Sequence, residues 1–275
     1  MDRQGHYRTI GRDEGAYRSF VPTPLQDIHL EMDEEMQALL EQAHERLKNR
    51  NLSDIDALQK EEVENSVNLV YGEKKSLALA FFQTDDKEDK EDKEDKKRKF
   101  DEQNLLQATR FAIERMQKLP ISSRLLKDVH WVMMQGEHNE RKYPGEMRTT
   151  PIWLGTKDDT LATAPFIPPV YEDMAKSIAD LENYIHYEEQ TDVLIMAALI
   201  HYQFEMIHPF IDGNGRIGRL LTLLFLMDRN VIQQPVLSLS KNLMSSSFKY
   251  FTGIASVEVS GTYEKWVKYF LQQLH

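Results

Sequence analysis

Residues 191–228 read TDVLIMAALIHYQFEMIHPFIDGNGRIGRLLTLLFLMD and decide the fold that the rest of the chain has to support. Two parts of this stretch, 191–206 and 216–228, are largely apolar at helical length, which predicts two buried helices. A His-Pro-Phe turn and an Asp-Gly-Asn-Gly loop join them, and the glycines permit backbone conformations that other residues avoid. The sequence therefore predicts two central helices joined by a short polar loop.

The chain around this stretch shows mostly helical periodicity. Apolar residues at three- and four-residue steps predict further helices at 28–47, 53–71, 104–119, 122–134, 170–187, 241–255 and 262–274. Ser122 or Ser123 is the expected N-cap of the fourth of these helices, and Gly72 is expected to end the second.

Two segments depart from this periodicity. Residues 136–169 are rich in Gly and Pro and contain a β-like run at 149–154, so they predict a long ordered loop with one hairpin. Residues 1–20 have no apolar period and predict a loose arm. The expected fold class is therefore all-α: a helical bundle with a small β-hairpin, preceded by an N-terminal helical region.

Composition narrows the function classes. Of the 275 residues, 41% are apolar and 29% are charged, a balance typical of globular proteins. The absence of cysteine excludes disulfides, thiolate metal sites and cysteine nucleophiles. The formal charge of −11 argues against a general nucleic-acid surface, and no apolar run reaches the ~18–20 residues of a membrane span. Without an apolar leader near Met1, we expect a cytoplasmic protein with no membrane or nucleic-acid partner.

Residues 85–99 read DDKEDKEDKEDKKRK and place charges on every side of any helix. This pattern is typical of a solvated linker or an exposed helix. We expect it to separate an N-terminal arm with helices, at 1–84, from a catalytic domain at 100–275, with 85–99 as the charged linker.

The loop between the two central helices carries groups suited to phosphate chemistry. Its Gly-Asn-Gly stretch presents backbone N–H groups at the start of a helix, where the helix dipole favours anions. Arg216 and Arg219 lie three residues apart and can bind phosphate oxygens. Asp212 offers a carboxylate to a divalent cation, and His208 can move a proton near neutral pH. Together these residues indicate phosphoryl or nucleotidyl transfer.

Residues 208–219, HPFIDGNGRIGR, match the full signature of the Fic (Fic/Doc) family. PGEMRTTPIWLG at 144–155 resembles the flap of that family, and LIMAALIHYQFEMIHPF at 194–210 resembles the helix that leads into its motif. The resemblance covers about residues 125–274. It implies an all-helical core with a β-hairpin flap over the active site.

The resemblance implies protein adenylylation, in which AMP passes from ATP to a Ser, Thr or Tyr hydroxyl of a target protein and pyrophosphate leaves. His208 is then the general base, and Asp212 holds Mg²⁺ at the phosphates. The other nucleotide contacts implied are Gly213, Asn214 and Gly215 as the anion hole, Arg216, Gly218 and Arg219 near the phosphates, and Tyr250 beside the adenine. ATP and Mg²⁺ are the implied cofactors, a protein is the implied target, and a homodimer is left open.

Gly215 bears on the group transferred, because family members that transfer a plain phosphate have Lys at this place. In the flap, Ile152, Trp153 and Leu154 are expected to dock the target as an extended strand. Trp153 fits the role of an anchor for the hairpin equally well.

Many family members silence themselves with a helix whose Glu pairs with the second Arg of the motif. DALQKEEVENS at 56–66 aligns with that helix and puts Glu64 at the inhibitory position, opposite Arg219. A second register, through Ser66, places Leu69 at the Glu position, and we reject it. An exposed acidic helix without an inhibitory role is the alternative.

Two other functions fit the same residues. One is removal of AMP from a modified protein at the same site, and the other is a non-catalytic nucleotide-binding module. The second is disfavoured because His208, Asp212 and both arginines are intact. His201 we interpret as a hydrogen-bonded helix residue rather than a second base.

Overall fold

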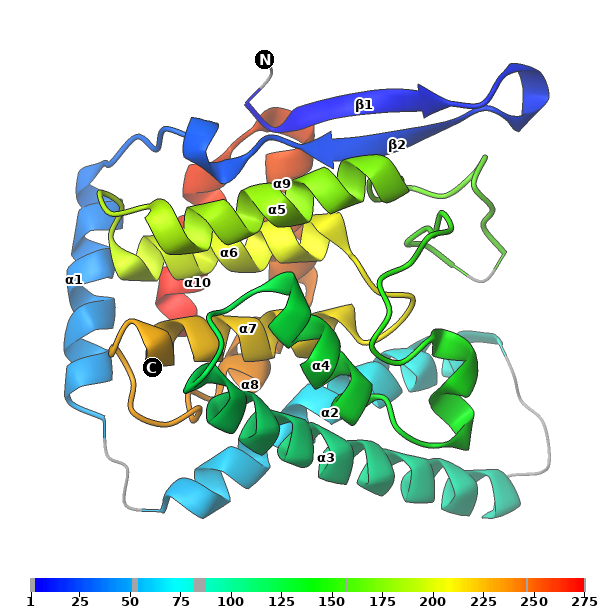
Figure 1. Cartoon of the computed structure of the whole chain (residues 1–275), viewed down its shortest axis with the longest axis horizontal. Coiled ribbons are helices and arrows are strands. Elements are labelled where there is room, and N and C mark those ends of the chain that lie inside the picture. The colour runs from blue at the N-terminus through cyan, green and yellow to red at the C-terminus, as the bar shows by residue number, and fades with distance from the viewer. Residues whose placement is uncertain (1–2, 51–53, 82–87, 157, 246, 275) are drawn as a thin grey trace.

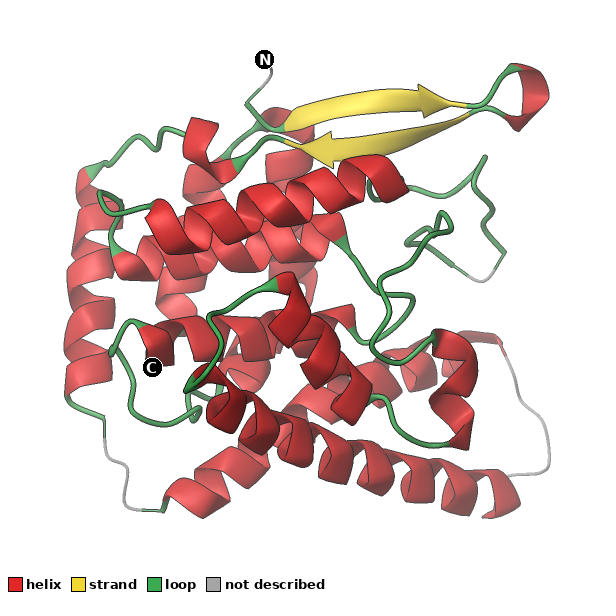
Figure 2. Cartoon of the chain, in the orientation of Figure 1, coloured by secondary structure: helices red, strands yellow, loops and turns green. Residues whose placement is uncertain are grey.

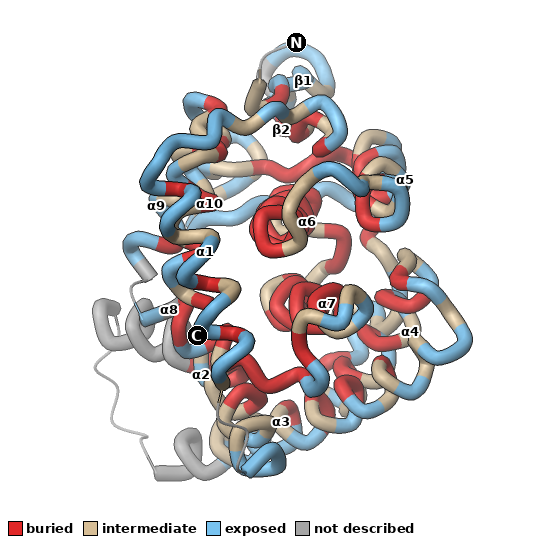
Figure 3. Tube along the Cα trace, turned by 90° about the vertical axis from the view of Figure 1, so that its left-hand side faces the viewer, coloured by how far each residue is buried: buried red, intermediate tan, exposed pale blue. Residues whose placement is uncertain are grey.

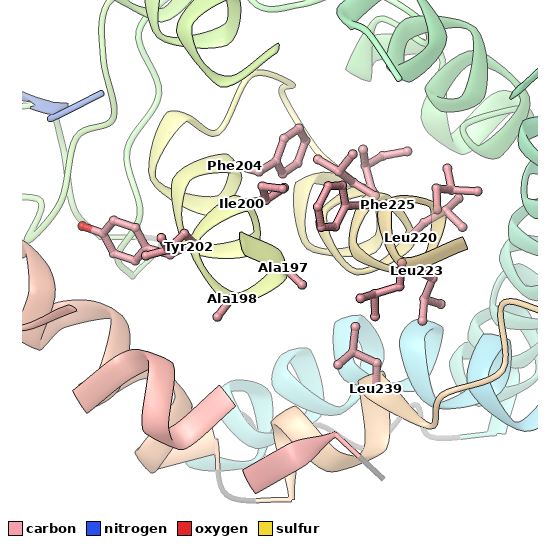
Figure 4. Packing of buried hydrophobic residues seen from close by; sticks show 14 of the residues in the cluster. Ala197, Ala198, Ile200, Tyr202, Phe204, Leu220, Leu223, Phe225 and Leu239 are labelled. Carbon is pink, nitrogen blue, oxygen red and sulfur yellow. The ribbon is translucent and has the colours of Figure 1, made fainter. Parts of the chain in front are cut away.

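Two helices, α6 (Val193–Ile207) and α7 (Asn214–Asp228), form the centre of the computed structural model, which describes residues 3–50, 54–81, 88–156, 158–245 and 247–274. Nearly every residue of both helices is buried (Figure 3). Ile200 and Phe204 of α6 point toward Phe225 of α7 (Figure 4). The apolar composition of α6 and α7 therefore predicted the core correctly, because a helix that is apolar all round has to be covered on every side.

The other helices surround this pair (Figures 1 and 2). Those that pack against α6 are α1 (Glu34–Lys48), α5 (Tyr171–Tyr187) and α10 (Tyr263–Gln273). Those that contact α7 are α2 (Ile55–Phe81), α3 (Glu88–Met116) and α4 (Ser123–Met133). Two further helices complete the shell. α8 (Leu239–Met244) packs against α2, and α9 (Ser247–Ser260) packs against α10. Among the described residues, no helix is both long enough and apolar enough to cross a bilayer.

Side-chain caps explain where several helices begin. The Asp33 carboxylate accepts from the Met36 backbone N–H at 2.8 Å, so α1 begins at Glu34 and not at residue 28. The Ser122 hydroxyl accepts from the Leu125 N–H at 3.4 Å, which confirms the predicted cap of α4. Each cap satisfies a backbone donor that the first helical turn leaves free.

Other helical predictions were also wrong. α2 continues through Gly72 to Phe81, and α3 already begins at Glu88, within the charged run. A glycine inside a helix costs only about 1 kcal/mol, and Glu, Lys and Arg favour helices. The single helix expected at 241–255 is replaced by α8 and α9.

The N-terminal segment is not a loose arm. It forms an antiparallel hairpin of β1 (Gly5–Ile10) and β2 (Tyr17–Pro22), which lies over α5 in Figure 1. Phe20 is fully buried, and its N–H donates to the Ile167 carbonyl at 2.8 Å. The Ser19 hydroxyl donates to the Pro168 carbonyl at 2.9 Å. These partners lie almost 150 residues away in the sequence, so local periodicity carries no sign of them.

The hairpin expected within 136–169 is reduced to one antiparallel bridge between Leu154 and Phe166. A short helix, η3 (Glu137–Lys142), opens this loop. Pro151 has no N–H to donate within the β-like run, and Pro165 and Pro168 remove donors from the opposite side. The small sheet of this mostly helical fold is therefore the N-terminal one.

His201 joins three helices of the core. Thr222 of α7 gives its hydroxyl proton to the Gly218 carbonyl, so its oxygen accepts from His201 Nδ1 at 3.1 Å. His201 Nε2 then accepts from the Tyr250 hydroxyl of α9 at 3.1 Å. Burial, aided by the charge of Arg219, lowers the pKa of His201 to about 3. His201 is therefore a neutral structural residue, as the sequence indicated.

We expect acid to weaken the fold through His201. Its pKa is about 3 in the folded chain and ~6.5 in an unfolded one. The unfolded state therefore takes up the extra proton, and the stabilisation present above pH 6.5 is lost as the pH falls toward the folded pKa. Urea unfolding at several pH values between 7.5 and 4.5 gives the free energy of unfolding as a function of pH. The slope of this free energy against pH should be smaller in His201→Gln than in the unmodified chain, by up to ~1.4 kcal/mol per pH unit. An identical slope in the variant and the unmodified chain would contradict the neutral, buried state of His201.

Candidate active site

The side chain of Asn214 closes the loop between α6 and α7. The Phe210 N–H donates to Asn214 Oδ1, and Asn214 Nδ2 donates to the Phe210 carbonyl, both at 2.8 Å. Asn214 is buried, so these bonds do not compete with water. Of the residues expected in the anion hole, Asn214 thus turns its side chain inward, and its backbone alone is left for a ligand.

His208 ends α6 in a left-handed backbone conformation, with φ of 48°. Its Nδ1 lies 3.1 Å from the Glu205 carbonyl oxygen, which can only accept, so Nδ1 carries the proton. Nε2 is then left with a free lone pair. Burial lowers the pKa of His208 to about 4, which keeps the ring neutral near pH 7. A neutral imidazole with a free Nε2 is able to accept a proton.

Asp212 is the anionic residue of the loop. Its Oδ1 accepts from the Gly213 N–H at 2.5 Å, and its Oδ2 lies 2.6 Å from Lys142 Nζ. Burial raises the pKa of Asp212, but the charges of Arg216 and Lys142 outweigh this and bring the pKa to about 2. The carboxylate is therefore ionised at every pH at which the protein is expected to work.

Asp212 can also hold a divalent cation. No cluster of three or more His, Cys, Asp or Glu suited to a metal occurs within the part of the chain that the structure describes. A cation at Asp212 would therefore take one carboxylate from the protein and its remaining oxygens from phosphate and water. Mg²⁺ is bound in this way in many phosphate sites, so the residue fits the predicted ion.

Arg216 and Arg219 project from the first turns of α7, and both are buried. Arg216 Nη2 lies 3.5 Å from Asp212 Oδ1. Gly213, with φ of 84°, precedes the helix in a conformation that favours glycine. A Cβ at Gly215 would approach Arg219 Nη1 to 3.2 Å, so the missing side chain leaves room for the guanidinium.

Most of the predicted site residues line one hollow, whereas Ile152 of the flap is not among its lining residues. The predicted residues that line it are Trp153, Leu154, His208, Asp212, Gly213, Asn214, Gly215, Arg216, Arg219 and Tyr250. Gly218 is different, because a Cβ there would lie 2.4 Å from Glu205 Oε1. It serves the contact between α7 and α6, and the structure gives no support for a place in the hollow.

The two adjacent aromatic residues of α9, Tyr250 and Phe251, have different surroundings. Tyr250 is buried and bonds to His201 through its hydroxyl, so much of it belongs to the core. Phe251 also lines the hollow and is 51% exposed. The ring available to a flat ligand is therefore mainly Phe251, which the sequence placed beside Tyr250 without separating their roles.

The structure does not pair Glu64 with Arg219. Arg219 donates to the Ser66 hydroxyl through Nε and Nη2, at 3.3 and 3.2 Å, and to the Ser66 carbonyl at 3.2 Å. The Glu64 carboxylate lies instead 3.7 Å from Lys60 Nζ. Residues two apart on a helix differ by about 200° in direction, so a helix that turns Ser66 toward Arg219 turns Glu64 away.

The face that α2 turns toward the hollow is neutral. Leu69 and Val70 line it, and Val70 follows Ser66 by one helical turn on the same side. The register through Ser66 that the sequence analysis rejected is therefore the one that faces the site. Glu62 fixes this placement, since its carboxylate accepts from the N–H and the hydroxyl of Ser240 on α8 at 3.0 and 2.6 Å.

Two residues that the sequence analysis did not assign hold the loop from outside. Arg148 donates through Nε to the His208 carbonyl at 2.8 Å, and through Nη2 to the carbonyls of Ile207 and Pro169 at 3.1 and 2.7 Å. His130 Nδ1 accepts from the Gly145 N–H at 2.9 Å, so its Nε2 donates to the Asp212 carbonyl at 3.0 Å. Arg148 is the last residue of the PGEMR segment, and the sequence gives no sign of its contacts because their partners lie far away in the chain.

The chain is similar to known proteins of one family. A model of the Fic/DOC family matches residues 120–226. Protein adenylyltransferase fic-1 of Caenorhabditis briggsae is 34% identical over 85 residues, which are 30% of this chain and 15% of the relative. Protein adenylyltransferase Fic of Drosophila grimshawi is 32% identical over 114 residues, which are 41% of this chain and 21% of the relative. The chain thus spans less than a quarter of either relative.

Among solved structures, a Fic family protein from Desulfovibrio desulfuricans G20 superposes with a TM-score of 0.63. The match covers 89% of this chain and 73% of the other, at 17% sequence identity. At this level of identity the comparison shows a shared fold.

We expect Arg148→Ala to destabilise the chain by about 3 kcal/mol, because several buried carbonyl oxygens lose their donor. Arg148→Lys keeps the charge but not the planar fork, so its loss should be intermediate. Urea unfolding measures both. Arg110→Ala, at an exposed position of α3, is the control and should change stability by less than about 0.5 kcal/mol. Equal stability of the Arg148 and Arg110 variants would remove Arg148 from this role.

Proposed function

Because residues 120–226 match the model of the Fic/DOC family, we propose that the chain transfers AMP from ATP to a Ser, Thr or Tyr hydroxyl of a target protein. The observation that carries this proposal is the single hollow in which the neutral His208 faces the loop of Gly213–Gly215 and two buried arginines. A site that only bound nucleotide would need the loop and the arginines, but no base.

His208 supplies the proton acceptor. Its free Nε2 takes the proton of the target hydroxyl as the oxygen attacks the α-phosphorus of ATP. The bond between that phosphorus and the oxygen bridging to the β-phosphate breaks, and pyrophosphate leaves with the electron pair. The target keeps AMP as a phosphodiester. The proton on Nδ1, held by the Glu205 carbonyl, orients the ring for this transfer.

The rest of the site stabilises negative charge on the phosphates. The backbone N–H groups at the start of α7 and the guanidinium groups of Arg216 and Arg219 offer fixed donors and positive charge. Asp212 would hold Mg²⁺, which supplies further positive charge to the phosphates when bound. Arg219 gives up only neutral acceptors on Ser66, and a phosphate oxygen binds a guanidinium more strongly than they do.

The target hydroxyl is expected to arrive past the flap. Trp153 and Leu154 line the hollow and are 41% and 37% exposed. The Leu154 N–H donates to the Phe166 carbonyl at 2.9 Å, which anchors the end of the extended run. A target segment that lies along residues 149–153 would be bound mainly by backbone contacts, with little demand on its sequence.

We expect His208→Ala to lower AMP transfer by about 10²–10⁴-fold, the usual effect of losing a general base. ATP affinity should be nearly unchanged, because His208 acts on the incoming hydroxyl. The measurement is transfer of α-labelled AMP to protein, with ATP binding followed by calorimetry. Arg219→Ala is the contrasting variant and should weaken both. Transfer at the unmodified rate by His208→Ala would end the mechanism.

The neutral face of α2 predicts that Glu64 does not restrain the enzyme. Glu64→Gly should leave self-modification with α-labelled ATP unchanged, since the carboxylate already faces Lys60. Val70→Glu, one turn after Ser66, would place a carboxylate on the side of Arg219 and should lower activity by about tenfold or more.

Val70→Gln has the same shape as Val70→Glu without the charge and is the matched control, expected to retain most activity. A rise in self-modification in Glu64→Gly would restore Glu64 as the inhibitory residue. Equal loss in the Glu and Gln variants would point to packing rather than charge.

A further inference from the structure

A second hollow shares Arg216 and Val70 with the candidate site. It lies between α2, α3 and η3. Four of its lining side chains are cationic: Lys93 and Lys97 of α3, Lys142 of η3, and Arg216 of α7. Two are acidic, Glu94 and Asp101. In a chain of net charge −11, such a local excess of positive charge indicates an anionic ligand.

The buried acid of this hollow is already engaged. Asp101 accepts from the Tyr71 hydroxyl at 2.8 Å through one oxygen. Its other oxygen lies 3.0 Å from His138 Nε2 and 3.4 Å from Asn139 Nδ2. Hydrogen bonds leave the negative charge of the carboxylate in place, so Asp101 and Glu94 together offset two of the four positive charges that line the hollow.

Arg216 is the link between the two hollows. Its side chain is 2% exposed, yet Nε and Nη1 have no hydrogen-bond partner among the residues that the structure describes. Asp101 lies 3.9 Å from Nη1, too far for a hydrogen bond. Buried donors without partners cost free energy, so an acceptor that reaches them would bind well.

The charged run of α3 takes part through one face only. Lys93, Lys97 and Asp101 follow one another at four-residue steps, which aligns them along one side of the helix. Lys96 and Lys99 lie on other sides of the same helix and do not line the hollow. The run that resembled a featureless linker in the sequence therefore presents a defined pair of lysines next to Arg216.

We propose that Lys93, Lys97 and Lys142 form, with Arg216, a subsite for the pyrophosphate end of the nucleotide and for the pyrophosphate that leaves. This inference rests on the proposed AMP transfer and names the part of the chain that receives the leaving group. Lys142 already lies 2.6 Å from Asp212, so the subsite is continuous with the anionic residue of the loop. The ligand is recognised by closely spaced phosphate charges, which several flexible ammonium groups bind well.

The test is binding of inorganic pyrophosphate to the full chain, measured by calorimetry. In Lys93→Ala/Lys97→Ala the dissociation constant of pyrophosphate should rise about tenfold, whereas that of AMP should stay the same. Lys96→Ala/Lys99→Ala removes the same charge from the same helix and should change neither. Equal weakening of pyrophosphate binding in the two double variants, or none in either, would overturn the subsite.

Two further experiments distinguish the subsite from an alternative ligand and from the proposed function. A polyglutamate peptide tests an acidic protein segment as the ligand, and the subsite is wrong if the Lys93/Lys97 variant weakens that peptide but not pyrophosphate. The α-labelled transfer assay on the unmodified chain tests the proposed function. Selective weakening of pyrophosphate binding without any transfer would sink the proposed function and leave the subsite standing.

Discussion

The site depends on the paired hydrogen bonds between the Asn214 side chain and the backbone of Phe210. They close the loop between α6 and α7 into a ring, and they are buried between two helices whose residues are nearly all buried. Because the ring is closed, the end of α6 and the start of α7 are fixed relative to each other. His208 is thereby held opposite the N–H groups and arginines that α7 presents.

Much of the core and of the loop could be predicted, because both are written in local sequence. Apolar runs of helical length indicate α6 and α7, and the polar residues between them indicate phosphate chemistry without any coordinates. The contacts of Phe20 and Arg148 could not be predicted, since their partners lie far away in the chain. The side of α2 that faces the site was predicted wrongly for a different reason. Its acidic sequence fits two helical registers, and only the contact between Ser66 and Arg219 selects one.

The two arginines of α7 have different surroundings. Arg219 is held by a neutral serine on α2, whereas Arg216 faces carboxylates on one side and a group of lysines on the other. The N-terminal helices therefore shape the phosphate end of the site, although they lie outside the segment that matches the family. Besides neutral contacts and positive charge they contribute the buried carboxyl groups of Glu62 on α2 and Asp101 on α3. Among the described residues no carboxylate of α2 forms a salt bridge with Arg219.

The proposed chemistry requires that His208 is neutral and carries its proton on Nδ1, which leaves Nε2 free to act. Nitrogen-15 NMR of the imidazole ring in the full chain measures both properties directly. The structure predicts a protonated Nδ1, a bare Nε2 and a titration midpoint near pH 4, since burial holds the pKa of His208 at about 4. A proton on Nε2 at neutral pH, or a midpoint near the ordinary value of ~6.5, would contradict the account.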